Sequence, residues 1–124
     1  MPSSRYVIAL DQDTVFTHCS VFDHDGNLMA TTERDHRQIL PAPGYVEHDP
    51  MEIWKNARLT LAEVLAVMEI TSNDVAALGI TNQRETAVLW DKTTGLPICN
   101  AIVWQDTRSH ECLDEFIQKL GADR

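Results

Sequence analysis

The chain has 124 residues, of which 44% are apolar and 23% are charged, a composition typical of one soluble globular domain with a single core. The formal net charge of −9 argues against binding to phosphates through lysine and arginine, so no nucleic-acid partner and no membrane partner is expected. The apolar run Tyr6–Leu10 is too short for a signal-peptide core or a membrane span. Cys19, Cys99 and Cys112 have neither disulfide-framework nor zinc-site spacing, and a cytoplasmic location is therefore expected.

Three short strands are expected at the start of the chain. Tyr6–Leu10 and Thr17–Phe22 are rich in β-branched and aromatic residues. The pair Asp25-Gly26 that follows is a strong turn signal, and Leu28–Arg37 alternates loosely between apolar and polar residues. The pattern predicts an antiparallel meander.

A helix is expected after the proline-containing loop Gln38–Tyr45. Asp49 occupies the N-cap position, Pro50 the first helical position and Glu52 the capping-box position. Apolar residues then recur at three- and four-residue spacing and form one face of the helix: Ile53, Ala57, Leu61, Val64, Leu65 and Met68. The helix is expected to end at about Glu69.

The second half of the chain is expected to open with a strand inside the sheet. Val75–Thr81 is apolar on both faces, which favours a buried parallel strand over an edge strand. Thr86–Trp90 and Pro97–Trp104 are two further strand candidates on either side of the turn Asp91–Gly95. This part of the chain therefore adds a parallel strand and a hairpin.

The last expected element is a helix over Thr107–Leu120, capped by Thr107 and ended by Gly121. The complete order is β-β-β-α-β with a β-rich insertion before the last helix. This order resembles the ribonuclease-H-like half-domain shared by sugar kinases, hexokinase and actin.

Several polar or aromatic side chains near the expected strand ends suit a small-molecule site. Arg84 and Glu85 follow the strand Val75–Thr81, and their forked donors and paired acceptors can hold two neighbouring hydroxyls of a polyol. A solvated surface pair is the alternative. Asp11, at the end of a strand, is by itself a turn former, and Trp104 is either a core residue or an apolar wall of a substrate pocket.

Three stretches carry a family resemblance. They are Leu10-Asp11-Gln12, the run from Pro43 to Pro50, and the pair GITNQRET (79–86) and NAIVWQD (100–106). Together they resemble the glycerol kinases within the FGGY family of carbohydrate kinases, over almost the whole chain. The resemblance implies an α/β fold of the ribonuclease-H-like type, with a mixed sheet, three initial antiparallel strands and flanking helices. It also implies that residues 1–124 are an incomplete N-terminal part of the first kinase domain.

The resemblance further implies an ATP-dependent phosphorylation of glycerol, with ATP and Mg²⁺ as cofactors. The implied roles are glycerol binding for Arg84, Glu85 and Trp104; nucleotide binding for Asp11, Gln12 and Thr14, and more weakly for Val15, Phe16 and His18; and Mg²⁺ binding through water for Asp11. The catalytic base is expected beyond Arg124, so no catalytic residue is expected within this chain and the isolated chain is expected to be inactive. Asp106 and Arg108 are interpreted as a helix-start charge and a solvated arginine.

The chain departs from the family where the family pattern reads Asp-Gln-Gly-Thr-Thr-Ser-Ser-Arg. Asp13 replaces a glycine that allows a tight turn close to phosphate, and it adds a negative charge. Val15 and Phe16 remove hydroxyls, and His18 replaces a permanently charged arginine. The alternatives are therefore an inactive paralogue or interaction module, a kinase of this family for another polyol, and, more distantly, another actin-like ATPase.

Two further expectations concern the surface of the chain. His24, His36, His48 and His110 lack metal-ligand spacing, so surface or loop roles are the default for each. A half-domain leaves apolar faces exposed where further strands would pack, and this predicts self-association into homo-oligomers.

Overall fold

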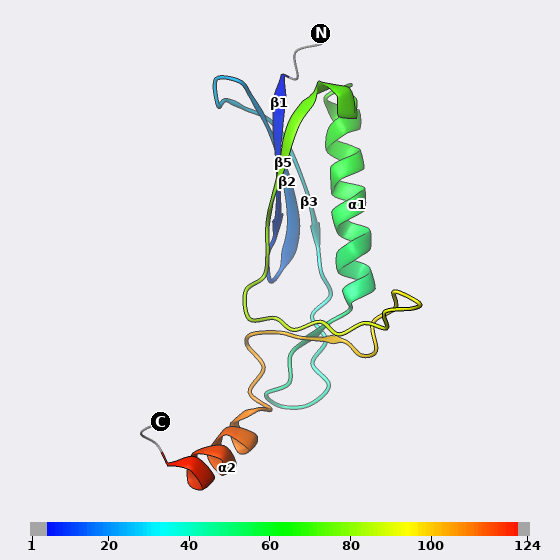
Figure 1. Ribbon diagram of the computed structural model, residues 1–124. Helices are drawn as coiled ribbons and strands as arrows, with labels where there is room; N and C mark the ends of the chain where they lie inside the picture. Colours follow the sequence, from blue (N-terminus) through cyan, green and yellow to red (C-terminus); the bar gives the residue numbers. More distant parts are fainter. Residues whose placement is uncertain (1–4, 122–124) are drawn as a thin grey trace.

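A mixed four-stranded sheet is the scaffold of the molecule in the computed structural model, which describes residues 5–121 (Figure 1). The strands are β1 (Tyr6–Gln12), β2 (Phe16–Asp23), β3 (Leu28–Asp35) and β5 (Val75–Thr81), in the spatial order β3-β2-β1-β5. β1 pairs antiparallel with β2 and parallel with β5, and β2 pairs antiparallel with β3. The predicted meander and the parallel direction of the later strand are confirmed.

The turn between β2 and β3 forms where the Asp-Gly signal predicts it. Gly26 has a φ of 84°, a value that glycine adopts without steric cost. The Asp23 carboxylate accepts hydrogen bonds from the backbone N–H groups of Asp25 and Asn27 at 2.9 and 2.8 Å. These bonds satisfy the turn's backbone donors and fix the register of the hairpin.

Helix α1 (Pro50–Val67) begins at the predicted cap. The Asp49 carboxylate accepts a hydrogen bond from the Met51 N–H at 2.8 Å, and Pro50 opens the first turn. The capping-box prediction is wrong, because the Glu52 carboxylate accepts from the backbone N–H of Arg37 at 3.3 Å instead. The helix ends two residues before the predicted Glu69, which has a left-handed φ of 52°.

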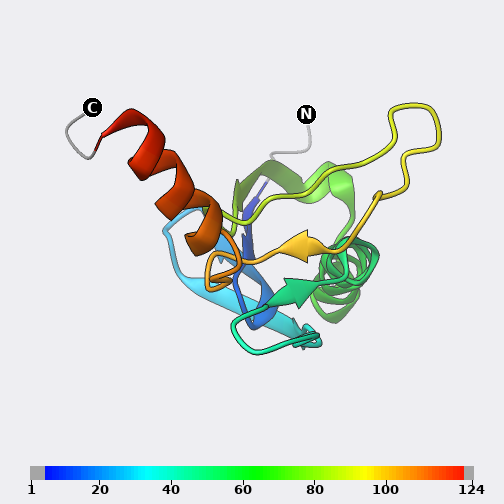
Figure 2. The same ribbon diagram turned by 90° about the horizontal axis from the view of Figure 1, so that it is seen from below.

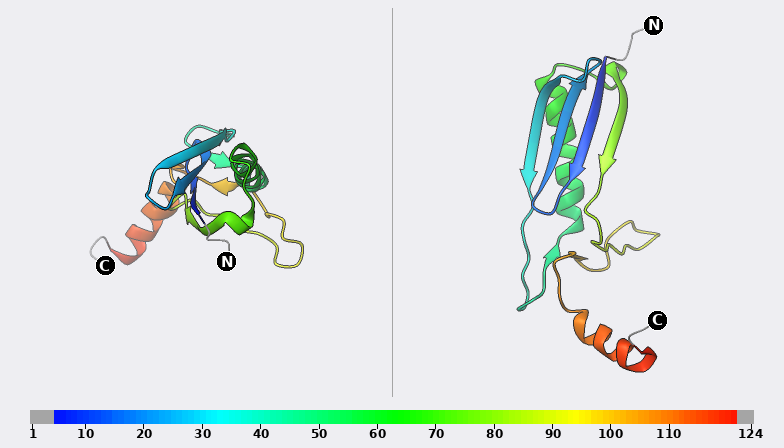
Figure 3. Two further views of the ribbon diagram at one scale, coloured as in Figure 1. Left: turned by 90° about the horizontal axis from the view of Figure 1, so that it is seen from above. Right: turned by 90° about the vertical axis from the view of Figure 1, so that its left-hand side faces the viewer.

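The core lies between α1 and one face of the sheet (Figure 3). Its fully or nearly buried apolar members are Ile8, Leu10, Cys19, Val21 and Val64. The alternation along β1 and β2 directs these side chains toward the helix, and the predicted helix face packs on them through Ala57, Leu61, Leu65 and Met68. Burial also raises the pKa of the Cys19 thiol to about 11.

The prediction that Val75–Thr81 is buried within the sheet is wrong for the described residues. β5 is the edge strand next to β1, and all its residues after Val75 are exposed. Leu78 is 44% and Ile80 is 69% exposed. The reason is that no described element pairs with the outer edge of β5, and that α1 packs mainly on β2 and β3 and leaves β5 uncovered.

Below the sheet, two very short strands tie the middle of the chain to its later part. β4 (Glu47–His48) pairs antiparallel with β6 (Ala101–Ile102), and the two lie side by side in Figure 2. The predicted strands Thr86–Trp90 and Pro97–Trp104 form only isolated bridges and this short β6. The predicted turn between them is confirmed, since Asp91 accepts the N–H groups of Thr93 and Thr94 through its carboxylate.

Helix α2 (His110–Leu120) begins later than predicted and extends away from the sheet (Figures 1 and 2). Thr107 does not cap it, because the Thr107 hydroxyl donates to the carbonyl of Gly44 at 3.1 Å. Gly121 follows its last residue with a φ of 81°, as expected of a helix terminator. Within residues 5–121, no helix combines the length and apolar composition needed to cross a lipid bilayer.

His36 lies in a loop, after β3, but neither His36 nor His48 has the surface position expected by default. They are 5% and 0% exposed and lie with their ring centroids 5.8 Å apart. Burial lowers the pKa of both imidazoles, so both rings are neutral at neutral pH.

Candidate functional site

A cavity of about 490 Å³ opens where β1 and β5 end. The carboxyl ends of these parallel neighbours lead into two loops, and such an edge is where open α/β sheets place ligands. The lining comes from the first loop, the second loop and one tryptophan: Asp11, Gln12, Asp13, Thr14, Asn82, Gln83, Arg84, Glu85 and Trp104. All six residues predicted for the polyol and for the main nucleotide contacts therefore lie around one cavity.

Hydrogen bonds join the two walls of this cavity. The Gln83 amide donates to the carbonyl of Asp13 at 3.0 Å. The Trp104 indole N–H donates to the Thr14 hydroxyl at 2.9 Å, and its backbone N–H donates to Thr86 Oγ1 at 3.3 Å. Thr86 in turn donates to the Gln83 side-chain oxygen. The first loop, the GITNQRET segment and the indole are thus one connected unit.

Arg84 and Glu85 present free polar groups to this cavity. Both are exposed, and within residues 5–121 neither side chain makes a hydrogen bond or an ion pair. Glu85 has a φ of 65°, a left-handed conformation that costs an L-residue about 1 kcal/mol or more. An unpartnered guanidinium next to a carboxylate on a strained turn matches the donor and acceptor needs of vicinal hydroxyls.

Asp13 changes the electrostatics of the first loop rather than its backbone conformation. Its φ is not in the positive region, so the glycine expected from the family pattern is not needed for the turn. Its carboxylate accepts the backbone N–H of Thr14 at 2.5 Å, and its own N–H donates to the Phe16 carbonyl at 3.0 Å. A donor that could otherwise meet an anion is therefore occupied by a carboxylate.

The structure does not bring the three weaker nucleotide candidates into the cavity. Val15 is 52% exposed, and Phe16 opens β2 with its ring nearly perpendicular to the His18 ring, at 6.4 Å between centroids. His18 Nε2 lies 3.3 Å from Ser20 Oγ on the same strand. None of the three lines the cavity.

Three cavity residues were not singled out as site residues from the sequence: Asp13, Asn82 and Gln83. The signal for Asn82 and Gln83 was present, since they are polar residues between the end of a strand and the Arg84-Glu85 pair. The contact from Gln83 to Asp13 spans 70 positions, and no local pattern indicates it.

Beneath the first loop lies a buried polar network. The Thr17 hydroxyl donates to Gln12 Oε1 at 2.9 Å, and Gln12 Nε2 lies 2.7 Å from His36 Nε2. The Asn56 amide, on α1, lies 3.2 Å from His36 Nδ1. A cavity residue is therefore in contact with an imidazole that lies against the helix that forms the core.

The interpretation of Arg108 as a solvated arginine is wrong. Its guanidinium donates to Asp106 and Glu47 at 2.7 and 2.8 Å and lies 4.1 Å from the centroid of the Tyr45 ring. The Asp106 side chain is 2% exposed and also accepts the Val46 N–H at 2.7 Å. These bonds hold the pKa of Asp106 well below its usual range, and the bond from Arg108 makes the largest contribution. The cluster fastens the PGYVEHDP loop to the segment before α2.

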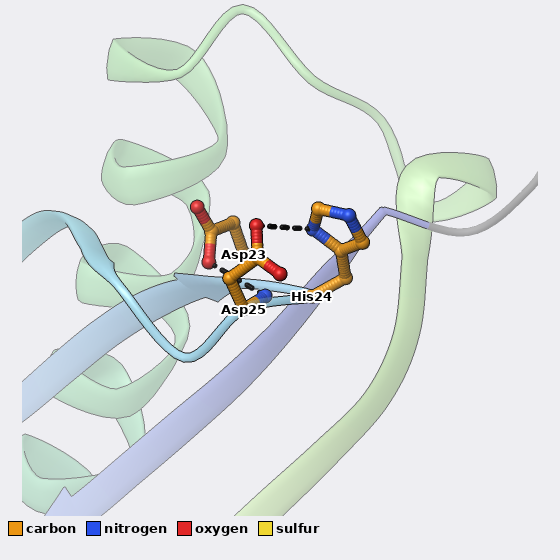
Figure 4. A group of neighbouring side chains, drawn as sticks. All are labelled: Asp23, His24 and Asp25. Carbon is orange, nitrogen blue, oxygen red and sulfur yellow. Dashed lines mark hydrogen bonds and ion pairs between the residues drawn. The ribbon is translucent and has the colours of Figure 1, made fainter.

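One other polar cluster lies at the opposite end of the sheet (Figure 4). Asp23, His24 and Asp25 place one ligand atom each within 4.8 Å of one another, the one such group among the described residues. The Asp23 carboxylate is already used by the β2–β3 turn, where Asn27 is the main cause of its lowered pKa. The cluster is therefore accounted for by the turn.

Comparisons with known proteins identify the family of the chain and its fold. The model of the "FGGY family of carbohydrate kinases, N-terminal domain" matches residues 6–124. Glycerol kinase of Clavibacter michiganensis subsp. michiganensis is 52% identical over 122 residues, which are 98% of this chain and 24% of that protein. The chain thus spans about a quarter of the length of the curated relatives it matches.

Solved structures show the same fold. Plasmodium falciparum glycerol kinase, crystallised with ADP, superposes with a TM-score of 0.85 and 36% identity over 94% of this chain and 23% of its own. Xylulose kinase from Rhodospirillum rubrum superposes with a TM-score of 0.84 and 27% identity over 94% of this chain and 24% of its own. The expected α/β sugar-kinase fold is confirmed.

Proposed function

Since the chain belongs to the FGGY family of carbohydrate kinases, we propose that it forms the N-terminal part of the first domain of a kinase that phosphorylates glycerol with ATP. Residues 1–124 would supply one side of the glycerol site and part of the phosphate site. The base that accepts the hydroxyl proton is assigned to a segment outside these residues. The isolated chain is then expected to bind but not to turn over.

The observation that carries this proposal is the single cavity shared by the two sets of residues. Arg84 and Glu85 offer donors and acceptors for neighbouring hydroxyls, while the Trp104 ring offers an apolar surface to the carbon chain. Asp11, Gln12 and Thr14 face the same space from the other wall. Phosphoryl transfer depends mainly on positioning donor and acceptor, and this arrangement brings their binding groups together.

The proposed cofactors are ATP and Mg²⁺. The first loop offers the carboxylates of Asp11 and Asp13 and the hydroxyl of Thr14, hard oxygen donors of the kind that Mg²⁺ prefers, directly or through water. When bound, the ion would neutralise phosphate charge next to these carboxylates. Since two carboxylates line this wall, nucleotide binding is expected to require the divalent ion.

Calorimetric titration of glycerol into the chain tests the polyol site. Arg84→Lys keeps the positive charge but removes the fork, so its glycerol affinity is expected to fall about tenfold, or about 1.4 kcal/mol. Arg58→Lys on the exposed face of α1 is the matched control and should bind like the unmodified chain. Equal binding by both variants, or tighter binding of a larger polyol than of glycerol, would overturn the glycerol assignment.

A second candidate is an inactive module that keeps the polyol site, and the Asp13 carboxylate on the Thr14 N–H favours it. Asp13→Gly removes this carboxylate and frees the donor. If phosphate handling has been lost through Asp13, this variant should gain MgATP affinity sharply. Unchanged affinity would count against this candidate.

We also propose a cytoplasmic location and self-association of the chain through its exposed apolar surface. The absence of nucleic-acid partners belongs to the same proposal and rests on the net charge of −9.

A further inference from the structure

Two buried histidines support the cavity from beneath without lining it. His36 and His48 are 5% and 0% exposed, and their ring centroids lie 5.8 Å apart. Each is connected by a glutamine to a different end of the loop Gln12–Thr14. That loop forms the wall of the cavity opposite Arg84 and Glu85.

The connection from His48 determines where its proton lies. Gln38 Nε2 donates to the carbonyls of Thr14 and His36 at 3.1 and 3.3 Å, and carbonyls can only accept. Gln38 Oε1 therefore faces His48 Nε2, at 2.8 Å, and must accept from it. The neutral His48 ring carries its proton on Nε2, and its buried Nδ1 has no hydrogen-bond partner within residues 5–121.

The connection from His36 holds the other end of the loop. Thr17 donates to Gln12 Oε1, which leaves Gln12 Nε2 facing His36 Nε2 at 2.7 Å. At this distance the amide donates to a ring nitrogen that carries no proton. The proton of the neutral ring then lies on Nδ1, 3.2 Å from the Asn56 Nδ2 that donates to the Asp35 carbonyl, so this second contact is not a hydrogen bond.

We propose that His36 and His48 are positioning residues of the cavity, whose neutral rings hold the Gln12–Thr14 loop in its binding geometry. His36 acts on Gln12 directly, and His48 acts on the Thr14 carbonyl through Gln38. This positioning role depends on the proposed function in one respect, namely that the Gln12–Thr14 loop takes part in phosphate binding.

Protonation of either ring breaks this arrangement. A proton on His36 Nε2 would face the Gln12 donor, and a proton on His48 Nδ1 would be a buried donor without a partner. The charged groups that face the rings are Glu52 on α1 for both, and Asp35 and Asp13 for His36. These carboxylates favour the protonated rings but do not outweigh burial, which lowers both pKa values.

The test observes the side-chain amides of Gln12 and Gln38 by ¹⁵N NMR while the pH is lowered from 8. Both signals are expected to move together, with a midpoint below the ordinary histidine value of about 6.5 and before the chain unfolds. In His36→Phe, the signal of the Gln12 side-chain amide should move to the position of a glutamine without a fixed partner. In Gln38→Met, the signal of the Thr14 backbone amide should shift. MgATP affinity is expected to fall about tenfold in each variant. The pH at which MgATP binding is lost on acidification should be lower in the variants than in the unmodified chain.

Val64→Ala is the control, because it removes a buried apolar contact of α1 without touching the network. It should lower stability while leaving both glutamine signals and their titration unchanged. If Val64→Ala changes them as much as His36→Phe does, or if the amides of the unmodified chain do not respond to acid, the positioning role is overturned. An unmodified chain that shows this titration but binds neither glycerol nor MgATP would instead refute the proposed function.

Discussion

Glu85 occupies the most demanding backbone position in the cavity. Its φ of 65° is one of two positive values among the described residues other than glycine, and the second, at Glu69, only follows a helix. A left-handed L-residue costs about 1 kcal/mol, so this position gives up some stability to direct a carboxylate into the cavity.

Glu85→Gly separates these two effects. Relief of the backbone strain is expected to raise the free energy of unfolding. Glycine also makes the unfolded chain more flexible, which offsets part of this gain, so the net rise is at most about 1 kcal/mol. Polyol binding is expected to be abolished. Glu85→Ala loses the carboxylate but keeps the strain, so it should lose binding without gaining stability. Urea unfolding and calorimetry measure the two quantities, and a glycine variant no more stable than the alanine variant would refute the strain argument.

Trp104, like Gln83, links the two walls of the cavity, and it does so through its indole N–H. Trp104→Phe keeps the apolar ring but removes the donor to Thr14, and it is expected to lower the free energy of unfolding by about 0.5–1.5 kcal/mol. Amide exchange at Thr14 should increase in parallel. Trp90→Phe, at a side chain that is 64% exposed, is the control and should change neither measurement.

At the scale of elements, the ion pairs of Arg108 hold the loop before α1 in place, in addition to the Asp49 cap of that helix. Asp106 lies almost fully buried between Arg108 and the Val46 N–H, and the motif residue Glu47 shares the same guanidinium. This cluster joins β4 to the segment before α2, so two segments that are 60 positions apart keep one geometry.

The pH dependence of stability follows from Asp106. Its folded pKa lies below the unfolded value of about 3.9, so the folded state binds fewer protons and its contribution is complete above about pH 5. That contribution is lost as the pH falls through the acid range. Asp106→Asn should be less stable at pH 7 and should show a flatter decline below pH 5 in urea unfolding. Asp114→Asn, on exposed α2, should follow the unmodified chain, and parallel acid curves for all three proteins would contradict this assignment.

At the scale of the whole molecule, α1 covers one face of the sheet, and no described element pairs with the outer edges of its two end strands, β3 and β5. α1 packs on the core face, while the outer edge of β5 has no described partner and exposes Ile80 beside an apolar groove that includes Leu65 and Leu78. An edge strand with apolar side chains is a template for further pairing.

Concentration-dependent association through this edge is therefore expected in size-exclusion chromatography. Ile80→Lys places a charge on the β5 edge and should shift the chain toward monomer without changing its circular dichroism spectrum. Thr31→Lys, on the opposite edge strand β3, is the matched control and should leave the association unchanged. A monomer at every concentration would refute the expectation.

The elements whose causes are local could be predicted from the amino-acid sequence. The β1–β3 meander, the Asp-Gly turn, the Asp49 cap and the end of α2 at Gly121 depend on residues a few positions apart, and each formed where it was predicted. The three motif stretches, GITNQRET among them, together also indicated the family.

Packing between distant elements sets which residues are buried and what they contact. The exposure of β5, the burial of His36 and His48, and the ion pairs of Arg108 all depend on elements far away in the sequence. The bond from Trp104 to Thr14 joins residues that are 90 positions apart. Burial and hydrogen-bond partners result from packing between elements, and a periodic or capping pattern within one element carries no information about them.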